Sequence, residues 1–193
     1  MSSYIVKKKE YQVVEDLKDY MSIVENEGNK YILYHFGDNV DGFGDFKFAY
    51  KRLKTCGITI PKVLEIDKKN HTFLVEYLDA KNCFQILIDE DISPKIFEKL
   101  YLLNYMARRN GYRLDFNPQN FIYCNDKLYY TAFTFTSYLR DQDFTQKEIR
   151  YWYYTKEFHE LLISKGIPVK NARLVSEFER NKQIVLDVVQ YFR

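Results

Sequence analysis

The sequence is short of the features that mark disulfide-linked, membrane-spanning or strongly charged proteins. Its 193 residues include only three cysteines, Cys56, Cys83 and Cys124, which lie far apart. No apolar run approaches the roughly 20 residues that a membrane helix needs. The 29 basic and 27 acidic residues leave a net charge of only +2. These scarcities argue against a disulfide framework, a membrane protein and a nucleic-acid-binding protein, so we expect a cytoplasmic protein with reduced thiols.

Histidine, glycine and proline are scarce as well. The three histidines, His35, His71 and His159, are not spaced as ligand pairs on a helix or hairpin, which argues against a metal site built on them. The N-terminal residues hold charges but no apolar stretch of the kind found in a signal peptide, so we expect none. With seven glycines and four prolines against 18% aromatic residues, the composition favours aromatic packing over long flexible loops.

Residues 11–78 predict roughly five strands with one helix inserted. The turn at Asn26–Asn29 separates two runs of β-branched and aromatic residues, which is a hairpin signal. Apolar residues at helical spacing between Phe46 and Leu53, followed by Gly57 as a C-cap, predict the helix. The lysines at 7–9 are expected to form a solvated tail.

Residues 79–193 predict a mainly helical part. Ser93-Pro94 is typical of a helix start, and the helix that it opens is expected to end near Gly111. A hairpin is predicted over 121–133, and two further helices over about 144–164 and 172–192. The fold class predicted is therefore α+β, with a first lobe at 1–78 and a second lobe at 79–193.

Between the long helix and the hairpin stands the sequence RLDFNPQNF, residues 113–121. This motif and the order of the elements around it resemble the two-lobed protein-kinase-like fold, in particular its compact atypical and lipopolysaccharide-kinase-like branch. The resemblance covers roughly residues 11–165. In that family the catalytic loop has an Asp that receives the acceptor's proton and, five residues later, an Asn that holds magnesium. The resemblance therefore implies Asp115 as catalytic base and Asn120 as metal and cofactor ligand.

Other parts of the family pattern are missing from the first lobe. The connection at Leu17–Ser22, where a glycine-rich loop should cover the phosphates, has no glycine. The lysine position on the third strand holds Tyr34, or His35 if the register differs by one, and Lys30 at the start of that strand is the remaining candidate for a phosphate contact. The predicted helix has Asp45 but no glutamate, and Asp45 is expected to cap its N-terminus.

The second lobe departs from the pattern too. The metal-binding Asp that should follow the hairpin is replaced by Ala132, which cannot coordinate a metal. The family's loop histidine is replaced by Arg113. Because each lost electrostatic group costs on the order of 10²–10³ in rate, we expect a degenerate, pseudokinase-like protein that binds or regulates a protein partner, with little or no phosphoryl transfer and no certain cofactor.

Two other interpretations stay open. One is an active small ATP-dependent phosphotransferase that uses Asp115 and Asn120 with Mg and ATP, for which Asp126, Asp141 or Asp143 would have to supply the missing ligand. The other is a structural α+β domain whose resemblance to the kinase-like fold is fortuitous. With either fold, Asp115 and Asn120 could build an Asx-rich turn that caps the following hairpin. The aromatic run at 150–154 and the final helix could form a partner surface or complete the core, and the oligomeric state is left open.

Overall fold

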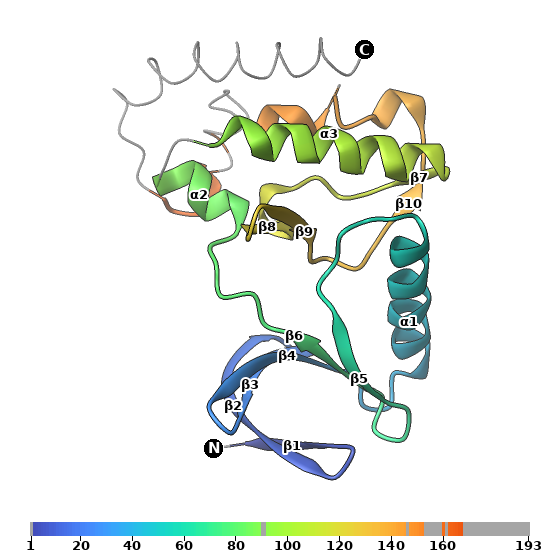
Figure 1. The fold of residues 1–193 in the computed structure, drawn as a ribbon, viewed down its shortest axis with the longest axis vertical. Helices are drawn as coiled ribbons and strands as arrows, with labels where there is room; N and C mark the ends of the chain where they lie inside the picture. Colours follow the sequence, from blue (N-terminus) through green and yellow to red (C-terminus); the bar gives the residue numbers. More distant parts are fainter. Residues whose placement is uncertain (1, 90–91, 146, 153–159, 161, 168–193) are drawn as a thin grey trace. The chain divides into compact units, whose positions relative to one another are not determined.

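The structure, a computed structural model, describes residues 2–89, 92–145, 147–152, 160 and 162–167 (Figure 1). The chain divides into two compact units. The first comprises Met1–Thr55 and Ile60–Asp79, and the second comprises Cys56–Thr59 and Ala80–Arg193. Each unit has its own secondary structure and is described by itself.

The first unit is a six-stranded antiparallel sheet with one helix, α1 (Val40–Thr55). The strand order is β1-β2-β3-β4-β6-β5, and α1 joins β4 to β5. The strands are β1 (Ser3–Val6), β2 (Lys9–Lys18), β3 (Met21–Asn26), β4 (Asn29–His35), β5 (Val63–Asp67) and β6 (Thr72–Glu76). The predicted hairpin turn is confirmed, because Asn26 pairs with Asn29 where β3 meets β4.

The sheet curls strongly, as Figure 1 shows for β1 to β6. Two register shifts lie along β2, between Val13 and Glu15 and between Asp16 and Lys18. Such bulges bend a strand and increase its twist. The curl brings the edge strand β1 to the turn after β5, where the Lys7 backbone N–H donates to Asp67 Oδ2 at 3.2 Å.

The two faces of the sheet carry different cores. Val6, Tyr11, Val24, Leu33 and Leu74 form one buried cluster. On the other face, the aromatic rings of α1 pack on the sheet, with the Phe43 and Phe46 centroids 4.7 and 4.6 Å from that of Phe73. Strand β6 is therefore buried on both faces, which accounts for its nearly continuous apolar sequence.

Helix α1 begins earlier than its apolar spacing predicted. Asn39 Oδ1 accepts the Gly42 backbone N–H at 2.9 Å, so Asn39 is the N-cap. Asp45, predicted to cap this helix, lies inside it. The lysines at 7–9 were also predicted incorrectly as a tail, because β1 pairs with β2 through a turn at Lys7 and Lys8. Both turn residues have positive φ, 45° and 74°. Turns of this kind are usually predicted from Asn and Gly, so two lysines gave no indication of a hairpin.

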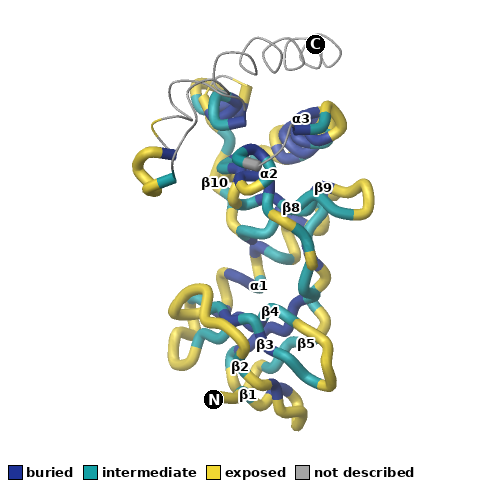
Figure 2. The backbone as a smooth tube through the Cα atoms, turned by 90° about the vertical axis from the view of Figure 1, so that its left-hand side faces the viewer, coloured by how far each residue is buried: buried dark blue, intermediate teal, exposed yellow. Residues whose placement is uncertain are grey.

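The named elements of the second unit, in the part of it that the structure describes, are the helices α2 and α3, two small sheets and several 3₁₀ turns. Figure 2 shows that α3 is buried along one side, whereas hairpin turns are exposed. The pairs β7–β10 and β8–β9 are antiparallel. The elements are α2 (Cys83–Asp89), α3 (Pro94–Arg109), β7 (Tyr112–Arg113), η1 (Pro118–Asn120), β8 (Phe121–Cys124), β9 (Lys127–Tyr130), β10 (Thr136–Ser137), η2 (Arg140–Gln142) and η3 (Glu148–Tyr151).

The predicted fold class, a two-lobed kinase-like α+β fold with a mainly helical second lobe, is wrong. In the described residues the main feature is the curled antiparallel sheet, accompanied by only a few short helices, so this part of the chain is mostly β. The helix predicted from 144 is replaced at its start by a turn, in which Asp143 Oδ1 accepts both the N–H and the hydroxyl of Thr145, and by the 3₁₀ segment η3. Residues 153–159 of that prediction lie outside the described residues. The helix predicted over 172–192 lies outside the described residues.

Candidate functional site

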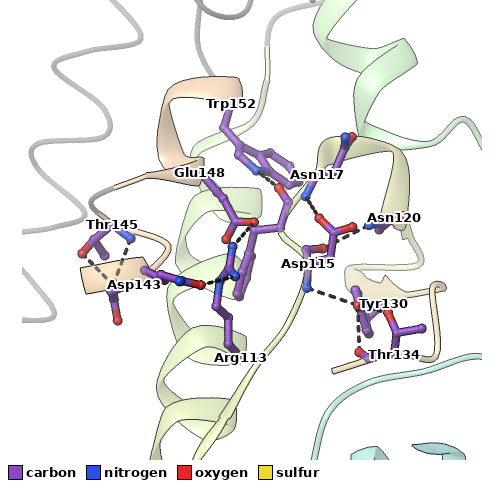
Figure 3. Close-up of polar contacts among 12 residues, drawn as sticks. Arg113, Asp115, Asn117, Asn120, Tyr130, Thr134, Asp143, Thr145, Glu148 and Trp152 are labelled. Atoms are coloured by element: carbon purple, nitrogen blue, oxygen red, sulfur yellow. Dashed lines mark hydrogen bonds and ion pairs between the residues drawn. The ribbon is translucent and has the colours of Figure 1, made fainter. Parts of the chain in front are cut away.

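The candidate site is the loop between β7 and β8 in the second unit. Leu114, Phe116 and Pro118 are buried, whereas Asp115 between them is exposed. The Phe116 ring lies 4.4 Å from that of Phe144, centroid to centroid, and its backbone carbonyl accepts the indole N–H of Trp152 at 2.7 Å. Alternate apolar side chains thus anchor the loop, and the Asp115 residue between them is exposed. Figure 3 shows the polar contacts around Asp115.

The side chain and the backbone N–H of Asp115 are each held by a hydrogen bond within the loop and the hairpin. Its Oδ1 accepts the Asn117 backbone N–H at 3.0 Å, which is the geometry of an Asx turn. Its backbone N–H donates to the Tyr130 hydroxyl at 3.2 Å. The orientation of the carboxylate is therefore fixed by local contacts.

Asn120 lies at the end of the same turn. Its Nδ2 donates to the Asp115 carbonyl oxygen at 3.2 Å (Figure 3). Asn117, between them, accepts the Gln119 backbone N–H through its side chain at 3.1 Å and so caps η1. The structure thus brings Asp115 and Asn120 together, and the interpretation of this pair as an Asx-rich turn is confirmed. A chemical role for either residue stays a prediction.

Tyr130 supports the loop from β9. Its ring is fully buried, and its hydroxyl donates to the Thr134 carbonyl oxygen at 2.9 Å while accepting from Asp115. Burial raises the pKa of this phenol to about 12. Tyr130 therefore stays neutral at physiological pH and serves as a hydrogen-bonding support.

The residues after β9 show what occupies the predicted metal-ligand position. Thr131 donates its N–H and its hydroxyl to the Asn120 carbonyl oxygen, at 2.8 and 3.1 Å. Ala132 follows, and then the buried Phe133 with a positive φ of 52°. In the described part of the chain, no group of three or more His, Cys, Asp or Glu side chains could hold a metal ion.

The acids considered as replacement ligands have other partners or lie in solvent. Asp126 accepts the Tyr123 hydroxyl at 2.8 Å and pairs with Lys95 and Lys99, at 3.6 and 3.8 Å. The Tyr123 bond, followed by the two lysines, lowers the pKa of Asp126. Asp141 is exposed in η2. No described contact brings either of these acids to Asn120.

Asp143 is buried in a separate polar cluster of the second unit. It accepts hydrogen bonds from Tyr138 at 3.0 Å and from Asn104 at 3.4 Å, in addition to those from Thr145. Burial acts to raise the pKa of Asp143, but the donors, led by Thr145, outweigh it and bring the pKa below its usual value. These contacts indicate that Asp143 is structural.

Arg113, which precedes the loop, forms the ion pair of the site. Its guanidinium donates to Glu148 Oε1 and to Gln142 Oε1, each at 2.9 Å (Figure 3). Burial raises the pKa of Glu148, while Arg113 opposes that rise. The pair connects β7 to the η2–η3 segment and so holds the far side of the loop.

Lys30, predicted as a phosphate contact, lies in the first unit. It is the second residue of β4, where it is paired across the sheet with Glu25, and its Nζ lies 5.9 Å from the centroid of the Tyr77 ring. Tyr34, at the position expected for the family's lysine, is buried, and burial raises its pKa far above the usual range.

The supports of the loop were harder to predict than the loop itself. Tyr130 is one of many tyrosines, and Glu148 lies 35 residues from Arg113. Of the two roles left open for the aromatic run at 150–154, core packing holds for Trp152, because it is fully buried; residues 153 and 154 lie outside the described residues. A useful signal is its position as the single tryptophan of the chain in an aromatic run, since a buried indole N–H requires an acceptor.

Comparison with known proteins adds no assignment, since neither a protein-family model nor a curated protein matches the chain. Among the described residues, none of the helices has the length and apolar character to cross a membrane.

Proposed function

We propose that the chain is a cytoplasmic, pseudokinase-like protein that binds or regulates a protein partner and carries out little or no phosphoryl transfer. The observation that carries the proposal is the loop at Asp115–Asn120, whose polar side chains are engaged in its own turn. The kinase-like element of the proposal depends on this loop sequence alone, because the predicted helical lobe is wrong. Nucleic acid and membrane are not part of the proposal.

The chemistry of the surrounding residues supports the loss of phosphoryl transfer. Magnesium in such sites is held by carboxylates together with phosphate oxygens. Ala132 stands where the resemblance requires a carboxylate, and none of the acids considered as replacements, Asp126, Asp141 and Asp143, has a described contact with Asn120. Asp115 could still accept a proton, but without a metal the developing phosphate charge has no counterion in the described site.

The proposal is tested by thermal unfolding with about 1 mM ATP, with and without magnesium, on the wild type and on Asn120→Ala. We expect no magnesium-dependent shift and no ATP turnover that Asp115→Ala removes. If the dissociation constant for ATP were a hundredth of that concentration, ATP would stabilise the folded chain by about 2.7 kcal/mol. The melting temperature of a chain of this size would then rise by roughly 5–10 °C. Such a shift, lost in Asn120→Ala, would favour the active phosphotransferase instead.

Partner binding requires its own measurement. A partner found by cross-linking in cells would be purified, and its dissociation constant for the chain measured directly. We expect Asp115→Ala and Asn120→Ala to bind it as tightly as the wild type, because the proposed role uses no phosphate chemistry. A partner whose binding requires ATP and an intact Asp115 would contradict the proposal.

A further inference from the structure

Helix α1 contains a glycine that its own unit does not require. Glycine in a helix interior costs about 0.5–1 kcal/mol relative to alanine. Gly42 has a local reason, since a Cβ there would lie 2.6 Å from the capping Asn39 side chain. Gly44 has none of this kind, because a Cβ there would meet nothing within 4 Å. The destabilisation of the helix by Gly44 is therefore not offset by a close contact within the described chain.

Gly44 lies between two exposed apolar side chains on one face of the helix. Val40 and Phe48 stand four residues before and after it, which places all three on the same side. Their exposed fractions are 58% and 54%. The face lies opposite the buried positions Phe43, Phe46, Ala49 and Leu53. Helix α1 thus presents two apolar side chains with a notch between them.

The charges at the two ends of this face have opposite signs, so they are complementary to those of a second, antiparallel copy of the same helix. Asp41 is in the first turn and Arg52 in the last. Within the described ranges of the chain neither forms an ion pair, and the Arg52 guanidinium lies over the Phe48 ring of the same helix, 5.7 Å from its centroid. Helix-dipole effects favour both placements, but they do not explain the notch. In an antiparallel pair of α1 helices, the register that puts Phe48 of one copy opposite Gly44 of the other also puts Asp41 beside Arg52.

We propose that this face of α1 is a self-association surface, in which two copies of the chain pair their α1 helices antiparallel about a two-fold axis. Phe48 of each copy fills the notch at Gly44 of the other, and Asp41 of each copy pairs with Arg52 of the other. A two-fold interface requires this kind of self-complementarity, in which residue i contacts j and j contacts i. The inference goes beyond the proposed function and concerns a different surface from the loop at Asp115.

The first test is sedimentation equilibrium of the full chain from about 5 to about 200 μM, because one helix face belongs to the small, weakly associating class of interfaces. We expect a monomer–dimer equilibrium for the wild type. Phe48→Gln should raise its dissociation constant at least about tenfold. Tyr105→Gln, at a residue of α3 with a similar exposed fraction of 51%, is the matched control and should leave it unchanged.

The second test uses charge exchange. Asp41→Arg and Arg52→Asp should each weaken the dimer at least about tenfold, since each places like charges across the interface. The double variant should restore it. Because the two residues are eleven positions apart on one helix and cannot pair within a copy, rescue identifies the contact between copies.

Gly44→Ala separates docking from folding. It should raise the melting temperature of the monomer by about 1–4 °C and still weaken the dimer, because the added methyl group occupies the notch. A monomeric wild type over the whole concentration range would overturn the proposal and leave the face to a different protein. A dimer that is insensitive to Phe48→Gln and to both charge changes would overturn it as well.

Discussion

At the scale of single residues, Tyr130 shows how one hydroxyl positions the candidate loop. It accepts the Asp115 N–H and donates to the Thr134 carbonyl oxygen, while its ring packs 5.2 Å from Phe121, centroid to centroid. Tyr130→Phe keeps the ring and leaves two backbone groups without this partner. We expect a loss of about 1–3 kcal/mol in the free energy of unfolding, measured by thermal and urea unfolding. Tyr105→Phe, whose side chain is exposed, is the control, and equal stability of the two variants would contradict this role.

The residues of the candidate loop illustrate what a sequence can and cannot predict. An Asx-rich turn at Asp115 and Asn120 was one of the interpretations left open, because Asp and Asn side chains bond backbone groups that are close to them in the chain. The supports Tyr130, Glu148 and Trp152 are 15 to 36 residues from the groups that they bind. No local spacing rule relates positions so far apart, so only the structure could show them.

At the scale of elements, His35 on β4 connects strands of the first unit. Its ring stacks on Tyr4 of β1 at 4.7 Å, and its Nε2 lies 3.2 Å from the hydroxyl of Ser22 on β3. The Ser22 hydroxyl donates to Asp16 of β2 at 2.6 Å. Burial lowers the pKa of His35 from 6.5, although the Asp16 charge opposes this. Neutral His35 therefore belongs to the folded sheet.

This shift gives a pH dependence with a definite sign. Because the unfolded chain binds the proton more tightly than the folded one, the contribution of His35 to stability is full above about pH 6.5 and is lost as the pH falls through that value toward the folded pKa. As the pH is lowered from about 7.5 to about 5.5, the melting temperature of the wild type should therefore fall by more than that of His35→Gln. A difference between the two that stays constant over this range would show that His35 does not titrate differently on folding.

The same scale explains the errors in the predicted elements. The hairpin at Asn26–Asn29 was predicted because its turn residues are the usual ones. Strand β1 was missed because its turn uses Lys7 and Lys8 with positive φ, and the pairing of β7 with β10 joins residues 23 positions or more apart. The helix expected from 144 does not form at its start, where a turn at 144–145 and the 3₁₀ segment η3 take its place, and residues 153–159 lie outside the described residues.

At the scale of the whole molecule, the division into two compact units predicts that a destabilising substitution in one unit leaves the local stability of the other unit unchanged. In the first unit, Asp67 accepts from the Lys7 N–H of the β1 turn and from the Lys69 and Asn70 N–H groups, and Asn70 Nδ2 donates to the Ile5 carbonyl oxygen at 3.4 Å. Asp67→Ala removes the acceptor that ties the two edges of the sheet together. Amide hydrogen exchange of β1 should then be faster, by about fivefold for each kcal/mol lost.

Tyr130→Phe is the counterpart in the second unit, where it should speed exchange of residues 113–121 and leave β1 unchanged. Asp38→Ala, at an exposed acid of the first unit, is the control and should alter neither region. Each unit buries its own apolar cluster, and opening free energies follow such cooperative units. If either substitution accelerated exchange equally in both units, the chain would open as one cooperative body, and stability changes at Asp67 would then be transmitted to the loop at Asp115.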